Sequence, residues 1–123
     1  MSVRNIVFSG LLLLAVSAAA EEESIFPKKM EGRWGRDQNT AEMELVKMES
    51  PTKAIFNAIF WDNCTRRGET TAELKEGTWT FVVPGGFRCA DVKVNMTKVT
   101  GKNRFEGTSD SVMQGQKFYL EWK

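Results

Sequence analysis

The sequence predicts an all-β protein, an antiparallel meander of about eight short strands that closes into a small barrel. Apolar and polar residues alternate with a period of two in many short segments. Residues that favour tight turns separate these segments. We expect a barrel because closure removes the two exposed edges of an open sheet, and a two-sheet sandwich is the alternative.

The alternating segments follow one another along the chain. They cover residues 30–36, 41–48, 53–61, 70–74, 78–83, 88–99, 103–108 and 116–122. In the fifth segment the apolar residues Trp79, Phe81 and Val83 alternate with two threonines over most of its length. In the second, the apolar phase shifts from Leu45 to Val46, which predicts a β-bulge. Turn residues occupy 76–77, 84–86, 100–103 and 114–115, so consecutive hairpins are expected.

Residues 53–61 are apolar on both faces apart from Asn57, and this pattern fits either a strand or a helix. The pair Ser50-Pro51 resembles a helix N-cap followed by proline at the first helical position. The isoleucine, phenylalanine and tryptophan content favours a strand. We predict a strand here.

Residues 1–20 are predicted to be a secretory signal peptide. Arg4 supplies the positive start, an apolar run follows, and small residues end at Ala20. The apolar stretch of about 15 residues is shorter than the roughly 20 that span a bilayer. We therefore expect a secreted or periplasmic protein with no membrane segment in its mature form.

The remaining chain has room for one domain. Residues 21–29 are polar and interrupted by Pro27, so we expect a flexible lead-in there. Residues 30–123 are expected to form a single barrel domain. Cleavage after residue 20 would remove Arg4 from the 17 basic residues, leaving 16 against 16 acidic ones. Electrostatic steering of a partner is therefore not expected to be a main feature.

Composition argues against several functional classes. The full chain has a formal net charge of +1 and no basic stripe, so nucleic acid is not an expected partner. The sequence contains no histidine, the commonest general base and nitrogen metal ligand. Its acidic residues fall mostly at alternating positions expected to be exposed, which does not favour a carboxylate pair for glycoside hydrolysis. We expect no catalysis, no metal and no cofactor.

Cys64 and Cys89 are predicted to form a disulfide, because a secreted chain with two thiols most simply pairs them. Asn63 and Asn95 each begin an N-glycosylation pattern, which has meaning only in a eukaryotic secretory pathway.

The strand pattern, the sequence Gly32-Arg33-Trp34 in the first strand and an aromatic-rich last strand resemble the small secreted barrels of the calycin group, which includes lipocalins and avidins. The last strand carries Phe118, Tyr119 and Trp122. The resemblance implies that Trp34 packs across the barrel floor beneath Arg104 or Lys123. The chain is shorter than a typical lipocalin, and biotin-binding residues of avidins cannot be placed on it, so neither binding activity is carried over.

Three tryptophans, Trp34, Trp79 and Trp122, lie in phase with apolar neighbours and are expected to fill the core. The alternative is that they line a ligand site. An eight-stranded barrel is just wide enough to be packed with side chains or to hold one small ligand. Because the predicted strands are short, we expect the filled form.

Residues 61–68 are the most function-like stretch, because a disulfide-anchored loop presenting tryptophan and arginine has the composition of a protein-binding hot spot. Its candidate binding residues are Trp61, Asp62, Arg66 and Arg67. The alternative is that both arginines are solvated turn residues and that the aspartate only caps the turn.

We therefore expect a secreted or periplasmic non-catalytic binding protein. One alternative is an inhibitor of a secreted or periplasmic hydrolase that acts through the loop around residues 61–67. Another is an accessory subunit that buries the outer face of the apolar strand from Ile55 to Trp61 against a partner.

Overall fold

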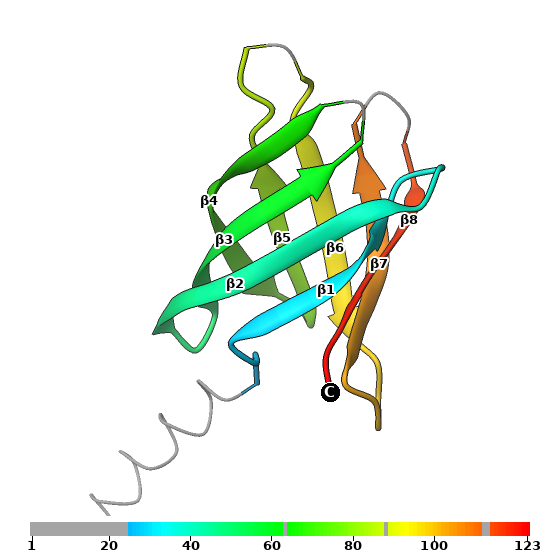
Figure 1. Cartoon of the computed structure of the whole chain (residues 1–123). Coiled ribbons are helices and arrows are strands. Elements are labelled where there is room, and N and C mark those ends of the chain that lie inside the picture. Colours follow the sequence, from blue (N-terminus) through cyan, green and yellow to red (C-terminus); the bar gives the residue numbers. More distant parts are fainter. Residues whose placement is uncertain (1–24, 63, 88, 112–113) are drawn as a thin grey trace, which may run out of the picture.

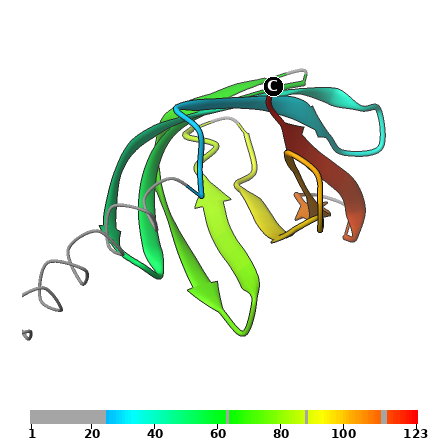
Figure 2. The same ribbon diagram turned by 90° about the horizontal axis from the view of Figure 1, so that it is seen from below.

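The computed structural model describes residues 25–123 except for residues 63, 88 and 112–113. The predicted signal peptide, residues 21–24 of the lead-in and Asn63 lie outside the described residues. The described chain forms the closed barrel that the sequence predicts, with β1 paired to both β2 and β8 (Figure 1). Viewed from below, the strands follow one another around a ring (Figure 2).

All eight strands pair antiparallel with their neighbours in sequence order. They are β1 (Lys29–Trp34), β2 (Asn39–Ser50), β3 (Lys53–Trp61), β4 (Thr65–Lys75), β5 (Thr78–Val83), β6 (Val92–Lys98), β7 (Arg104–Asp110) and β8 (Gln116–Glu121).

Local sequence accounts for the joints. Glu76 and Gly77 both have positive φ, 53° and 83°, which is the geometry of a two-residue hairpin turn. The predicted bulge is confirmed, because the register between β2 and β3 shifts between Leu45 and Lys47. Residues 53–61 form a strand, as predicted. The helix alternative is wrong, because alternate residues of this segment are buried in the barrel.

Two strands are several residues longer than the sequence suggested. β2 has 12 residues and β4 has 11. The largest difference is in β4, which was expected to begin at Thr70 and begins at Thr65. Its first half pairs residue by residue with β3 in a hairpin, and this pairing extends the strand through a polar segment that lacks an apolar alternation.

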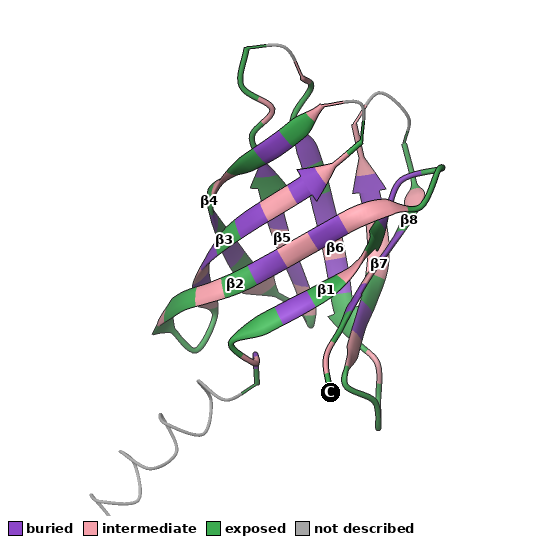
Figure 3. Ribbon diagram, in the orientation of Figure 1, coloured by how far each residue is buried: buried purple, intermediate pink, exposed green. Residues whose placement is uncertain are grey.

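The interior is filled by side chains from alternate positions of every strand, seen as purple bands in Figure 3. Phe56, Phe60 and Phe105 are among its largest fully buried side chains. Phe60 stacks on Phe118 with ring centroids 5.9 Å apart. A ligand deep inside the barrel would have to displace these rings.

The core begins earlier than the expected start near Met30. Phe26, within the predicted lead-in, is 3% exposed. Its ring lies 4.9 Å from Phe56, 4.9 Å from Trp79 and 5.3 Å from Phe105. Hydrophobic burial therefore attaches this segment to the barrel, at the lower end in Figure 1.

The predicted disulfide between Cys64 and Cys89 is present. It joins the start of β4 to the connection between β5 and β6, with a sequence separation of 25 residues. The start of β4 and the connection between β5 and β6 lie at the upper end of the barrel in Figure 1, away from the start of the described chain.

Replacing Cys64 and Cys89 together with alanine is expected to lower the free energy of unfolding by about 3 kcal/mol, because the open loop gains entropy in the unfolded chain. Urea denaturation of the variant and the oxidised protein, followed by circular dichroism, measures the difference. The unmodified protein with added reductant is the control and should shift in the same direction. An unchanged unfolding midpoint in both samples would show that the bond does not stabilise the fold.

Candidate functional site

A pocket of about 320 Å³ opens at the disulfide-bearing end of the barrel. Residues from the ends of β1, β2, β4, β7 and β8 and from the segments that connect strands line it. Its lining includes Trp34, Arg36, Asp37, Asp62, Arg66 and Ser109. Small-molecule sites generally occupy about 300–1,000 Å³, so this pocket lies at the small end of that range.

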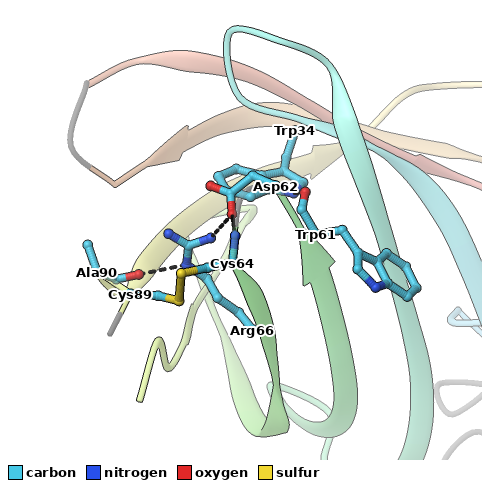
Figure 4. Close-up of polar contacts among 7 residues, drawn as sticks. All are labelled: Trp34, Trp61, Asp62, Cys64, Arg66, Cys89 and Ala90. Atoms are coloured by element: carbon cyan, nitrogen blue, oxygen red, sulfur yellow. Dashed lines mark hydrogen bonds and ion pairs between the residues drawn. A yellow bond between two sulfur atoms is a disulfide. The ribbon is translucent and has the colours of Figure 1, made fainter. Parts of the chain in front are cut away.

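Arg66 is the central polar group of this pocket. Its side chain points inward from β4 and is only 5% exposed. Nε donates to the Ala90 carbonyl at 2.7 Å, and Nη1 donates to Asp62 Oδ1 at 2.8 Å (Figure 4). Its third nitrogen, Nη2, forms no hydrogen bond with any residue that the structure describes. This leaves Arg66 with a donor available at the pocket.

Asp62 holds both the arginine and the disulfide segment in place. Its Oδ1 accepts from Arg66 and also from the backbone N of Cys64 at 2.7 Å. Its side chain is 27% exposed, so solvent screens one side of the ion pair. A buried guanidinium needs such a partner, because an unpaired buried charge is strongly destabilising.

Trp34 forms the aromatic wall of the site. Its ring centroid lies 5.2 Å from Arg66 Cζ, within cation–π distance. Its Nε1 donates to the Trp61 carbonyl at 3.1 Å, which fixes the ring orientation. Phe60 packs against it from the core with ring centroids 5.6 Å apart. The ring is therefore held rigidly between the filled interior and the pocket.

Ser109 is a pocket residue that the sequence reasoning missed. It is 1% exposed, and its hydroxyl oxygen accepts from the backbone N of Gly35 at 3.2 Å. The signal was present, because Ser109 continues the inward phase of Phe105 and Gly107. The predicted strand ended one residue too early, at residue 108, to include it.

The structure brings Trp34, Asp62 and Arg66 together, but not the other predicted binding residues. The indole of Trp61 points away from this cluster, and only its carbonyl takes part (Figure 4). Arg67 is exposed on the outer face of β4. Trp79 is buried with Phe26 in the lower core, and Trp122 packs half-buried on Phe105.

The prediction that residues 61–68 form a loop is wrong at both ends of this range. Trp61 ends β3, and Thr65, Arg66, Arg67 and Gly68 belong to β4. Strand pairing turns Arg66 inward and Arg67 outward, so the two arginines lie on opposite faces of the sheet. Neither is a solvated turn residue.

The basic residue above Trp34 also differs from the one implied by the calycin resemblance. Arg66 covers the ring, whereas Arg104 lies 3.9 Å above Tyr119 on the outside. Because Phe105 points into the barrel, its neighbour Arg104 must point outward. Burial acts to lower the pKa of Arg104, but hydrogen bonds and the charges of Glu106 and Glu121 raise it overall. Lys123 lines a groove beside Tyr119, away from the Trp34 pocket.

The pocket combines charges that balance. Arg36 pairs with Asp37 at 3.7 Å, and Arg66 pairs with Asp62. Two arginines and two aspartates therefore contribute no net charge to its lining. This balance favours an uncharged polar molecule over an anion or a cation, because neither sign of charge dominates.

No group of three or more histidine, cysteine, aspartate or glutamate residues is placed to hold a metal ion in the described part of the chain. Within that same part, no helix has the length and apolar character needed to cross a membrane.

Comparisons of the chain with models of protein families, with curated proteins and with solved structures found no match. The eight-stranded antiparallel barrel is consistent with the calycin-like architecture that the sequence resembles.

Proposed function

We propose that this protein is a secreted or periplasmic, non-catalytic binding protein that holds a small uncharged polar molecule at the disulfide-bearing end of its barrel. The observation that carries the proposal is the pocket in which the nearly buried Arg66 lies over Trp34, with its Nη2 unbonded to any described residue. Concave sites that combine apolar walls with a few well-placed polar groups are typical of ligand binding.

The rigidity of the site supports this proposal. Arg66 is held by Asp62 and Ala90, and the disulfide ties the segments that carry both partners. A site held in its binding geometry loses little conformational entropy when the ligand arrives. The disulfide also supports placement of the protein in an oxidising compartment.

The filled interior favours this site at the barrel end over a deep internal one. Phe60 and Phe118 stack directly beneath the level of Trp34, and Phe81 adds an edge contact to the same cluster. The inhibitor alternative has less support, because residues 65–68 pair with β3 rather than forming a free loop.

Tryptophan fluorescence tests the proposal. The protein is titrated with monosaccharides, free amino acids and nucleosides, and separately with a secreted protease and a secreted glycosidase. We expect one small-molecule class to produce a saturable change. Trp34→Phe should abolish the change, and the matched control Trp79→Phe should retain it, because Trp79 lies outside the pocket.

Other outcomes would redirect the functional assignment. A response only to a hydrolase that is lost in Trp61→Phe would favour the inhibitor alternative, since this indole points outward. A small-molecule response that survives Trp34→Phe would place the ligand elsewhere and contradict the proposed pocket.

A further inference from the structure

The barrel has one incomplete seam, between β4 and β5. Their ladder contains three residue pairs, from Glu73 with Thr80 to Lys75 with Thr78. On its other side, β4 pairs with β3 over nine positions, from Lys53 with Glu73 to Trp61 with Thr65. From Thr65 to Ala72, β4 therefore has a strand partner on one side only within the described structure.

The unpaired side of β4 presents main-chain hydrogen-bonding groups. Lys75 and Thr78 flank a two-residue turn and so form a hydrogen-bonded pair. Backbone groups alternate in direction along a strand, so those of Arg67, Glu69 and Thr71 point to the same side as those of Lys75. The backbone groups of Leu74, the residue before Lys75, point to the other side of β4. Its N donates to the carbonyl of Thr52, the residue before β3.

β5 does not cover these groups, because its end lies beneath β4 toward the barrel interior. The buried Thr70 donates its hydroxyl to the Val82 carbonyl at 2.6 Å, where a ladder would place a main-chain donor. Pro84 Cγ is 3.5 Å from the position of a Cβ added to Gly68, another inward-facing residue. A groove of about 460 Å³ runs along this seam.

Two charged side chains beside this edge have no charged partner in the described part of the chain. Arg67 and Glu69 are exposed, and neither forms an ion pair or a side-chain hydrogen bond with the residues that the structure describes. They flank Gly68 symmetrically and lie on the same outer face. An antiparallel copy of this strand, centred on Gly68, would place each charge opposite its complement.

We propose that the β4 edge from Thr65 to Thr71 is a self-association surface that pairs antiparallel with a second copy of this chain around a two-fold axis at Gly68. In this register Arg67 lies opposite Glu69 of the second copy, and the symmetry repeats the pair. Gly68 lies opposite Gly68 of the second copy, at a non-hydrogen-bonded position, where antiparallel strands approach most closely. Because glycine has no side chain, nothing obstructs this close approach.

The charge pattern selects this register over its neighbours. A two-fold axis at Glu69 would oppose two like charges, which is destabilising. An axis at Thr70 would place Glu69 opposite Thr71, and Arg67 opposite Glu73, a position already paired with Thr80 of β5. The Gly68 register alone among these three joins both charges to opposite partners. Arg66 lies within this stretch but faces the Trp34 pocket, whereas Arg67, Glu69 and Thr71 are not part of the pocket lining. The self-association proposal therefore does not depend on the proposed ligand.

Sedimentation velocity over a range from micromolar to millimolar protein tests this proposal. We expect the unmodified protein to dimerise as its concentration rises. Arg67→Glu and Glu69→Arg should each raise the dimer dissociation constant at least about tenfold, because each creates a like-charge pair. The double variant Arg67→Glu/Glu69→Arg should restore dimerisation. Lys117→Glu, an exposed charge reversal on β8, is the matched control and should dimerise normally.

Hydrogen exchange tests the proposal on the unmodified protein, so the result does not depend on whether a variant folds. The amides of Arg67, Glu69 and Thr71 should gain protection as the protein concentration rises, whereas exposed amides elsewhere should not. A protein that stays monomeric up to about 1 mM would overturn the proposal. So would dimerisation that the single reversals leave unchanged, or a double reversal that fails to restore it in a protein shown by circular dichroism to be folded.

Discussion

Replacing Gly32 or Gly107 with alanine is expected to lower the free energy of unfolding by more than about 4 kcal/mol or to prevent folding. A Cβ at Gly32 would lie 1.8 Å from the Tyr119 carbonyl oxygen, and one at Gly107 would lie 1.8 Å from that of Asn95. Both obstacles are backbone atoms of a paired strand, so relief requires the ladder itself to move. Circular dichroism and chemical denaturation of each variant provide the measurement.

Gly68→Ala is the matched control for these two variants. Gly68 also lies at an inward position of a strand, but its added Cβ would make ordinary contact with Pro84 at 3.5 Å. We expect a change of less than about 1 kcal/mol, measured at low protein concentration. Equal stability of all three variants would contradict the close approach of the strands at Gly32 and Gly107.

Phe26→Ala is expected to lower the free energy of unfolding by about 3–5 kcal/mol, the usual cost of truncating a buried phenylalanine. The ring contacts Phe56, Trp79 and Phe105, and its loss would open a cavity at the lower end of the core. Denaturant unfolding followed by tryptophan fluorescence measures this effect, because Trp79 lies next to the cavity.

Ile25→Ala is the control, since Ile25 is 40% exposed and adjacent to Phe26 in the chain. This substitution is expected to change stability by less than about 0.5 kcal/mol. If Phe26→Ala proved equally mild, the segment would be the flexible lead-in that its polar composition predicts, and the barrel core would begin at Met30.

The strand order was largely predictable because each strand carries a local signal. The alternation of Trp79, Phe81 and Val83 identifies β5 without reference to any other part of the chain. The bulge near Val46 and the turn at Glu76-Gly77 follow equally from local residues. Phe26 was missed because a single phenylalanine in a polar segment has no periodicity to show which way it points.

The candidate site was predictable only in part. Trp34, Asp62 and Arg66 were each recognised, but for different reasons, and nothing in the sequence placed them together. Arg66 and Arg67 are adjacent in the chain and have the same chemistry. Only the pairing of β4 with β3 turns one into the pocket and the other onto the outer edge.

The sequence by itself determined that this protein is an antiparallel β-meander with a disulfide between Cys64 and Cys89, because period-two patterning, turn residues and paired cysteines are local or compositional properties. Tertiary structure decided which arginine covers Trp34, how Phe26 joins the core and where the seam beside β4 remains unpaired. These features depend on register and on contacts between distant segments. A shift of one residue along a strand would exchange its inner and outer faces, and no local pattern in the polar half of β4 specifies that choice.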